Sequence, residues 1–212
     1  PGTVFTNGTH WRVVDKVKAG DKLTLNIPEK TSPPLLWDKE ISIIYEDEDI
    51  LIVNKPSGIS SHPTRNHPNG TLCNAVANYL IKTNNEPAAG RAGGRLDKVT
   101  SGVMVFAKNS LSASRLNGNM QKIYNAIVWG QIEETGTINA PIYRPDMGLT
   151  IRTVDERGDE AITHWKRISQ LDDKAFVEVR TETGRTHQIR VHMSFCGNPL
   201  AGDTMYGDFM PE

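Results

Sequence analysis

A short turn that leads straight into a β-strand constrains this chain more than any other segment. Residues 94–102 (GRLDKVTSG) lie between two glycines and precede the alternating run of residues 103–107 (VMVFA). This pattern predicts a turn followed by a strand. The strand would hold the carboxylate of Asp97 rigidly while its tip stays accessible, which suits a nucleophile. An Asp in a turn more often only accepts a nearby backbone N–H, so both interpretations stand at this point.

The composition predicts a globular protein with a real core. The chain has 212 residues, of which 37% are hydrophobic, enough for one sizeable domain or a domain and a fragment. No run approaches the length needed to span a bilayer, and no signal-peptide pattern is present. Cys73 and Cys196 lie on apolar stripes of expected helices, so we expect small buried thiols in a reducing compartment. We therefore expect a cytoplasmic protein.

Charge is unevenly distributed along the chain although the formal net charge is only −1. Residues 29–50 carry seven acidic and two basic side chains, whereas residues 91–128 carry six basic side chains and Asp97 alone. The near-neutral total argues against a protein that simply coats nucleic acid. An electropositive surface around Asp97 would nevertheless guide a polyanion, with an ordinary solvated charged face as the alternative.

The apolar patterns predict an α+β fold with a mixed, mainly antiparallel sheet flanked by helices and loops. Thr71 is expected to cap a helix with apolar residues at i, i+3, i+4 and i+7 spacing, and Gly197 to end the last helix. A hairpin is expected at Asn7-Gly8. Strands and further helices are expected near residues 22–25, 41–44, 49–54, 110–120, 123–129, 161–168, 175–181 and 186–196.

Several chemistries lack the residues that they need. His187 and His192 are five apart on a helix and face different sides, and no spacing typical of metal ligands occurs, so we expect no metal. No phosphate-binding glycine fingerprint and no Gly-x-Ser-x-Gly elbow is present. Glycoside hydrolysis needs two carboxyl groups, and Asp97 has no obvious partner of that kind. A single nucleophilic Asp needs a cation to stay ionised, for which Arg185 and Arg190 are candidates; a surface or phosphate contact is equally compatible with either.

Four blocks resemble the RluA-type pseudouridine synthases in the order in which that family carries them. They are the strand and Lys-Pro-x-Gly turn at 49–58, the Arg-Leu-Asp turn at 94–102, the tyrosine strand at 122–130, and the segment 183–192 with the Gly-Asp turn at 202–207. Residues 1–27 more weakly resemble the end of a small S-four-like RNA-binding module. We therefore expect a remnant of that module at 1–28, a linker at 29–40, and the synthase catalytic domain at 41–212, with further strands absent at its end.

The resemblance implies a role for each matching residue. Asp97 would be the nucleophile, Tyr124 would pack on the uracil and assist proton transfer at carbon five, and Arg190 would pair with Asp97. Arg95 would fill the gap left when the target nucleotide flips out of its stack. The remaining RNA contacts would come from Lys55, Arg185 and His187. No cofactor is implied, because the reaction is a net-neutral isomerisation.

The expected function is conversion of a uridine in structured RNA, ribosomal or transfer, to pseudouridine by a monomeric enzyme. The alternative is a non-catalytic RNA-binding protein that retains the fold, and a nucleoside or glycoside hydrolase is a further rival. Gly94 departs from the His that most RluA-type members carry ahead of Arg-Leu-Asp. The spacing from Leu116 to Tyr124 is also short for the family. The target uridine and the choice between nucleophilic addition and a glycal route cannot be read from the sequence.

Overall fold

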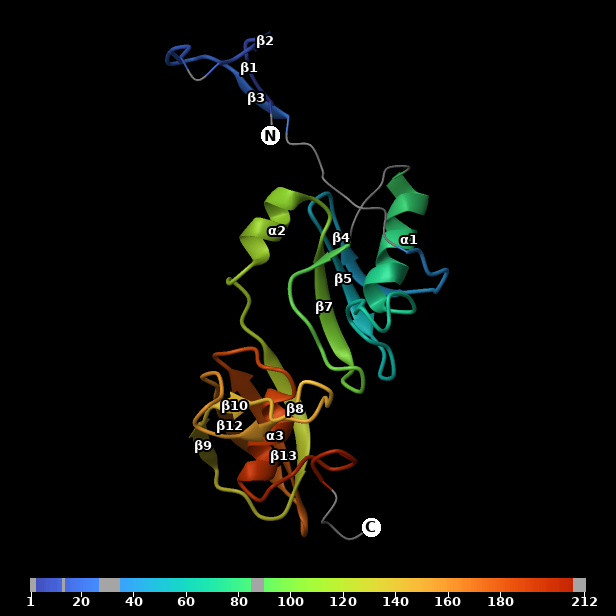
Figure 1. Cartoon of the computed structure of the whole chain (residues 1–212), viewed down its shortest axis with the longest axis vertical. Helices are drawn as coiled ribbons and strands as arrows, with labels where there is room; N and C mark the ends of the chain where they lie inside the picture. The colour runs from blue at the N-terminus through green and yellow to red at the C-terminus, as the bar shows by residue number, and fades with distance from the viewer. Residues whose placement is uncertain (1–2, 13, 27–34, 85–89, 208–212) are drawn as a thin grey trace. The chain divides into compact units, whose positions relative to one another are not determined.

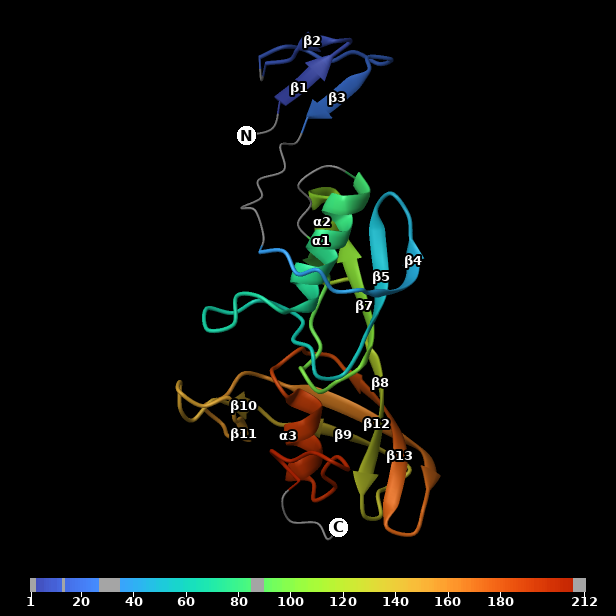
Figure 2. The same cartoon turned by 90° about the vertical axis from the view of Figure 1, so that its right-hand side faces the viewer.

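The structure is a computed structural model that describes residues 3–12, 14–26, 35–84 and 90–207 (Figures 1 and 2). The chain forms two compact units, Pro1–Gly118 and Asn119–Glu212. The division falls inside the range 41–212 that the sequence predicts as one catalytic domain. The expected boundary at residue 28 and the first half of the expected linker lie outside the described residues. These domain boundaries remain predictions.

The N-terminal residues form a small antiparallel sheet with strand order β2-β1-β3. Asn7 and Gly8 both have positive φ, at 48° and 84°, which is the geometry of a tight hairpin turn that Asn-Gly favours. The predicted hairpin is therefore confirmed. The bounds are β1 (Thr3–Thr6), β2 (Thr9–His10) and β3 (Leu23–Asn26).

The larger sheet of the first unit has the order β4-β5-β7-β6, and every pair in it is antiparallel. β5 pairs with β7 from Ile50 opposite Ala107 to Lys55 opposite Gly102. The segment that follows β5 and the segment that precedes β7 therefore meet at one end of this sheet. The bounds are β4 (Ser42–Glu46), β5 (Ile50–Lys55), β6 (Arg91–Ala92), β7 (Gly102–Ala107), α1 (Leu72–Asn84) and α2 (Ser110–Leu116).

Helix α1 packs along one face of this sheet (Figure 2). Its apolar residues recur at helical spacing, as predicted, and Thr71 accepts the Asn74 N–H at its start. Burying this stripe against two strands gives the unit its core. The core consists of Leu72, Val76 and Leu80 of α1, Leu51 and Val53 of β5, and Met104 and Phe106 of β7.

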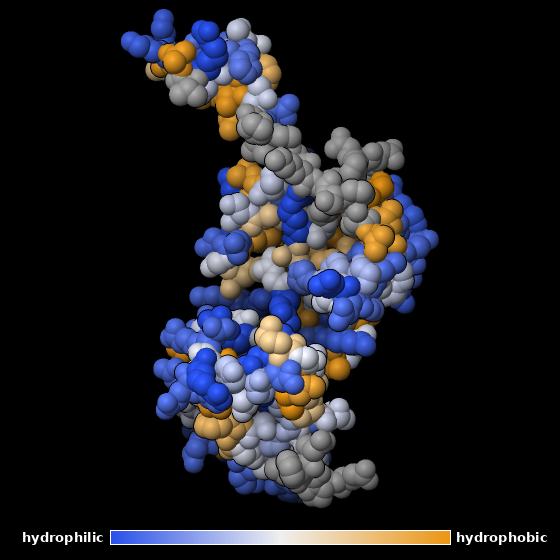
Figure 3. All heavy atoms as spheres, viewed as in Figure 1, coloured by the Kyte–Doolittle hydropathy of each residue, from blue (hydrophilic) through white to orange (hydrophobic). Residues whose placement is uncertain are grey.

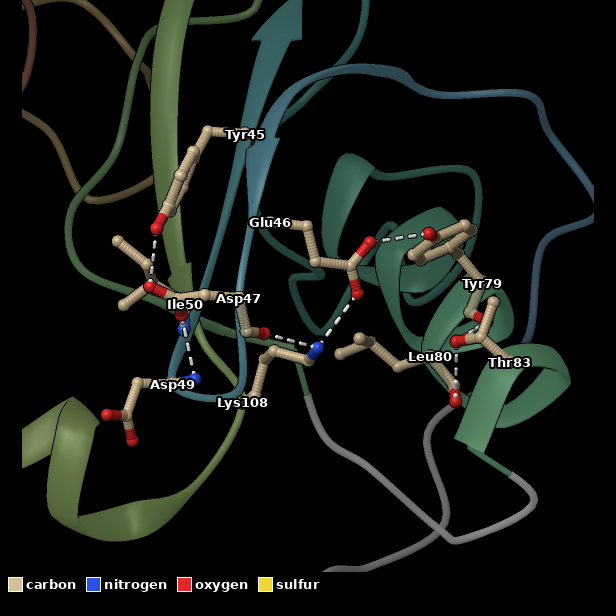
Figure 4. Close-up of polar contacts among 9 residues, drawn as sticks. All are labelled: Tyr45, Glu46, Asp47, Asp49, Ile50, Tyr79, Leu80, Thr83 and Lys108. Carbon is tan, nitrogen blue, oxygen red and sulfur yellow. Dashed lines mark hydrogen bonds and ion pairs between the residues drawn. The ribbon is translucent and has the colours of Figure 1, made fainter.

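The opposite end of the sheet is tied together by charged side chains (Figure 4). Lys108, just after β7, donates to a Glu46 carboxylate oxygen at 2.8 Å and to the Asp47 carbonyl at 2.6 Å. Tyr79 of α1 donates its hydroxyl to the other oxygen of Glu46 at 2.6 Å. Glu46 therefore links the end of β4 both to helix α1 and to the residue that follows β7, two strands away in the sheet.

The second unit contains a four-stranded antiparallel sheet with the order β8-β13-β12-β9. The predicted strand at 123–129 and the predicted antiparallel pair are confirmed, whereas β9 and the β10–β11 hairpin were not predicted. The bounds are β8 (Ile123–Trp129), β9 (Thr135–Asn139), β10 (Ile142–Tyr143), β11 (Thr153–Val154), β12 (Ile162–Gln170), β13 (Lys174–Thr181) and α3 (Gln188–Phe195). The α+β fold class with antiparallel sheets is thus confirmed.

Helix α3 closes the core of the second unit and also carries a buried polar chain. Its Met193 packs on the inward residues of β8 and β13, while His192 is fully buried. His192 places Nε2 2.9 Å from the Ala140 carbonyl and Nδ1 2.8 Å from the Thr163 hydroxyl, which accepts from Gln188. Nε2 must carry the proton, since a carbonyl only accepts, and Nδ1 therefore accepts from Thr163. These partners fix a neutral ring in one tautomer.

Hydrophilic and hydrophobic side chains are interspersed on the face seen in Figure 3. Within the described part of the chain, no helix has the length and apolar character needed to cross a membrane. The prediction of two buried thiols is wrong for Cys196, which is exposed at the end of α3, whereas Cys73 is partly buried on α1. Cys196 falls one residue past the last helical turn, where the buried stripe no longer continues.

Candidate active site

The candidate nucleophile lies at the end of the first unit's sheet where β5 ends and β7 begins. Pro56 follows β5 and cannot continue the ladder, so the chain turns there. Gly102 starts β7 with φ of 130°, a conformation that only glycine adopts readily. The segment 56–61 and the segment 94–101 therefore lie side by side. Asp97 is half-buried in the second of them.

Hydrogen bonds to segment 56–61 hold the backbone on both sides of Asp97. On the N-terminal side, the Ser61 hydroxyl donates to the Leu96 carbonyl at 2.6 Å and accepts the Leu96 N–H at 3.1 Å. On the C-terminal side, the Gly58 N–H and the Lys55 ammonium both donate to the Lys98 carbonyl, at 2.8 and 3.1 Å. The Asp97 carbonyl itself accepts the Thr100 N–H at 3.1 Å. The carboxylate thus projects from a backbone with little freedom to move.

Lys55 does not occupy the position that direct RNA binding requires. Its side chain is 0% exposed, and its ammonium donates to the carbonyls of Pro56, Ile59 and Lys98 at 3.0, 2.6 and 3.1 Å. Burial lowers the pKa of this ammonium, while attraction to Asp97 opposes that shift. The placement argues against the RNA contact expected from the sequence, because all three ammonium protons already have acceptors inside the protein.

Arg95 and Lys98 flank Asp97 and are both exposed. The turn therefore presents two cations to solvent on either side of a half-buried carboxylate. Such a surface attracts a phosphate backbone and leaves the carboxylate within reach of a base lifted out of its stack. The placement of Arg95 is compatible with the contact predicted for it, which remains a prediction.

Tyr124 and Arg190 belong to the second unit. Tyr124 lies on β8 opposite Val179 and packs partly buried against that unit's core. Arg190 on α3 donates from Nε and one terminal nitrogen to the two carboxylate oxygens of Asp203, each at 2.7 Å. The predicted pair between Arg190 and Asp97 would join the two units and remains a prediction.

Asp203 is the partner that sequence reasoning missed for Arg190. It also accepts the N–H groups of Met205 and Tyr206, at 3.0 and 3.2 Å. Burial would raise the pKa of Asp203, but the hydrogen bonds from Arg190 and these backbone groups outweigh it, so the pKa lies below its ordinary value. The Gly-Asp turn at 202–203 was part of the family resemblance, and that was the signal that could have found it.

The other predicted residues of the second unit gather near Tyr206 and at the start of α3. His187 has φ of 58° and lies with Nδ1 2.8 Å from the Tyr206 hydroxyl. The guanidinium of Arg190 lies 5.0 Å from the centre of the same ring. Arg185 is exposed and donates to the Glu160 carbonyl at 2.8 Å. Arg185 and His187 therefore remain candidates for RNA contacts.

A metal centre is not evident among the residues that the structure describes, where no group of three or more His, Cys, Asp or Glu side chains is arranged to hold an ion. The chemistry available at the Asp97 turn is that of a positioned carboxylate with nearby cations. This set suits covalent or electrostatic assistance to bond cleavage at an electrophilic carbon.

Comparison with known proteins gives the same assignment as the motifs. The family model for RNA pseudouridylate synthase matches residues 49–195. The chain is 39% identical over 215 residues to an uncharacterised RNA pseudouridine synthase of Bacillus subtilis, YlyB, covering 97% of this chain and 71% of that protein. It is 40% identical over 211 residues to the ribosomal large subunit pseudouridine synthase D of Pseudomonas aeruginosa, covering 97% of this chain and 66% of that one.

Solved structures with a similar fold carry the same family description. Human RNA pseudouridylate synthase domain containing 4 superposes with a TM-score of 0.65 at 27% identity, covering 80% of this chain and 70% of that one. Human RNA pseudouridylate synthase domain containing 1 superposes with a TM-score of 0.63 at 25% identity, covering 85% of this chain and 73% of that one. The chain belongs to the RNA pseudouridylate synthase family. It is accordingly an RNA pseudouridine synthase, an isomerase.

Proposed function

We propose that Asp97 is the nucleophile with which this enzyme converts a uridine of ribosomal RNA to pseudouridine. The observation that carries the proposal is the half-buried carboxylate of Asp97 on a turn held from both sides, next to the exposed cations Arg95 and Lys98. The names of the relatives, among them ribosomal large subunit pseudouridine synthases, favour large-subunit ribosomal RNA over transfer RNA as the substrate.

The reaction moves one bond and one proton. The bond from ribose carbon one to uracil nitrogen one breaks, the base rotates, and a bond from the same sugar carbon to uracil carbon five forms. Carbon five then loses its proton while nitrogen one gains one, so the substrate and product are isomers. Asp97 would assist the cleavage, and Tyr124 would pack on the base and take part in the proton transfer at carbon five.

The remaining predicted residues would handle the RNA. Arg95 would enter the space that the flipped nucleotide leaves, because its side chain is exposed beside the nucleophile. Arg185 and His187 would contact the RNA from the second unit. Arg190 would supply a guanidinium that Asp203 already orients. In the role that the resemblance implies, this guanidinium would pair with the carboxylate of Asp97.

Release of tritium tests the proposed reaction directly. Transcripts of large-subunit ribosomal RNA and of transfer RNA, each labelled with tritium at uracil carbon five, are incubated with the protein. Tritium in water together with pseudouridine in the digested ribosomal transcript supports the proposal. Release from transfer RNA alone would overturn the choice of ribosomal RNA. Free uracil would indicate a hydrolase, and binding without either product would indicate a non-catalytic RNA-binding protein.

A further inference from the structure

A buried lysine at the base of the catalytic turn calls for an explanation, because a buried charge is costly unless its partners are well placed. Lys55 is fully buried, yet its ammonium has three carbonyl acceptors. Two of them belong to its own turn, and the third belongs to Lys98, the residue directly after Asp97. The cation therefore joins the two segments that meet at this end of the sheet.

Ser61 makes the matching connection on the other side of Asp97. Its hydroxyl is buried and uses both its proton and a lone pair on the backbone of Leu96, the residue directly before Asp97. One small side chain thereby satisfies both the N–H and the carbonyl of that residue. Leu96 also packs against the core of the unit, which anchors it further.

Ser57 and Gly58 complete the connection. The Ser57 hydroxyl donates to the Val99 carbonyl at 2.8 Å, and the Gly58 N–H donates to the Lys98 carbonyl at 2.8 Å. Gly58 has φ of 87°, so a side chain there would strain the turn. Residues 96, 98 and 99 are thus each held by segment 55–61, and Asp97 lies between them.

We propose that segment 55–61 is a clamp that positions Asp97 for reaction, with Lys55 and Ser61 as its principal positioning residues. The inference rests on the proposed role of Asp97 as the nucleophile. A displacement of about 1 Å at a reacting group can cost about a hundredfold in rate, so loosening either side of the clamp lowers the chemical rate without removing a group that touches RNA. The buried ammonium also attracts the Asp97 carboxylate, which must stay ionised.

Ser61→Ala is the decisive variant. It removes one buried hydroxyl group and leaves the backbone and the Cβ atom in place. Thr64→Ala is the matched control, because the Thr64 hydroxyl lies in the same loop but accepts only the His67 N–H, at 3.1 Å, among the contacts found for it. Both variants lose one hydroxyl, but only the Ser61 hydroxyl is bonded to the turn that carries Asp97.

The measurement is single-turnover tritium release with enzyme in saturating excess over the labelled ribosomal transcript. Under these conditions the rate constant does not depend on how much of the enzyme is folded, so a loss of stability alone leaves it unchanged. We expect Ser61→Ala to lower the rate constant at least tenfold with the dissociation constant for RNA within twofold of the wild-type value. Thr64→Ala is expected to keep the wild-type rate constant. A wild-type rate constant for Ser61→Ala overturns the inference.

Two further variants test the other side of Asp97. Lys55→Met removes the ammonium and is expected to lower the rate constant more than Ser61→Ala. Because Lys55→Met can fail to fold, Ser57→Ala tests the same side at an exposed hydroxyl, with an expected fall of at least threefold. Wild-type rate constants for Ser57→Ala and for folded Lys55→Met would overturn this half of the inference. Wild-type enzyme that releases no tritium would instead refute the proposed function.

Discussion

Arg190 and Asp203 form a two-point ion pair in the second unit, with both hydrogen bonds at 2.7 Å and side chains only 14% and 4% exposed. The pair joins helix α3 to the Gly-Asp turn that follows it. Because both charges are largely withdrawn from water, the pair compensates part of the cost of burying each of them. Two hydrogen bonds within the second unit therefore hold the Arg190 guanidinium.

Asp203→Asn is expected to destabilise the protein strongly. The substitution removes the carboxylate that accepts two hydrogen bonds from the largely buried guanidinium of Arg190, and loss of one partner of a buried ion pair typically costs about 3 kcal/mol. Urea unfolding followed by circular dichroism measures the loss. Asp155→Asn is the matched control, because Asp155 makes the same kind of two-point pair with Arg157 at the surface, where solvent screens it. Equal losses in the two variants would contradict the importance of burial.

His192 is expected to make stability depend on pH below 6.5, the ordinary pKa of a histidine. Burial lowers its pKa below the ordinary value of 6.5, while the bond to the Ala140 carbonyl opposes the shift. The unfolded chain therefore binds the proton more readily than the folded one, so this contribution is fully present above pH 6.5 and is lost as the pH falls below it. Urea unfolding at several pH values should show a steeper slope for wild type than for His192→Gln. Identical slopes would contradict the assignment.

Lys108→Met is expected to loosen the far end of the first unit's sheet. It removes the bond to Glu46, whose pKa burial would raise but which the hydrogen bonds from Lys108 and Tyr79 hold below its ordinary value. We expect a loss of about 2 kcal/mol of unfolding free energy near neutral pH, where Glu46 is ionised. The loss should shrink as the pH falls through that lowered pKa.

Lys82→Met is the control for this prediction. Lys82 pairs with Asp38 at 2.7 Å, but the two side chains are 59% and 83% exposed. Exposed pairs add little to stability, so urea unfolding should barely change. If Lys82→Met lowered the unfolding free energy as much as Lys108→Met does, the partial burial of the Lys108–Glu46 pair would not explain its contribution to stability.

The two cysteines are expected to differ in reactivity. Burial raises the pKa of Cys73 to about 12, so its thiol is neutral and shielded, whereas Cys196 is exposed. Titration of the native protein with a thiol reagent should modify one cysteine, and titration in urea should modify two. Cys196→Ser should abolish the reaction of the native protein. Two fast-reacting thiols in the native state would contradict the placement of Cys73.

Much of the fold could be predicted because local patterns and tertiary packing agree. The helix at 72–84 shows its buried stripe in the sequence, and Asn7-Gly8 is a hairpin signal that the backbone geometry confirms. β9 and the β10–β11 hairpin carry no such signal. The two strands of that hairpin have two residues each and gain their order from pairing rather than from an alternating pattern.

The sequence indicated a candidate nucleophile, but it did not indicate the hydrogen bonds that hold the turn around it. Asp97 stood out because of the turn and the strand after it. The hydrogen bonds of Ser61 join residues 35 positions apart, and no local pattern reveals such contacts. Lys55 is the opposite case, because a lysine at the end of a strand suggests a surface cation until its burial is known, and its burial argues against the expected RNA contact. Arg190 was singled out from the sequence as a site residue, which remains a prediction, but its hydrogen-bonded partner Asp203 was not.

The most direct measurement of the central claim compares Asp97→Asn with Asp172→Asn in single-turnover tritium release from the ribosomal transcript. Asp172 lies in the exposed turn between β12 and β13 and provides a matched loss of one carboxylate. We expect Asp97→Asn to release no tritium while it binds the RNA with nearly wild-type affinity, since binding depends on basic contacts. Asp172→Asn should react at the wild-type rate. Pseudouridine formation by Asp97→Asn at the wild-type rate would contradict the assignment of Asp97 as the nucleophile.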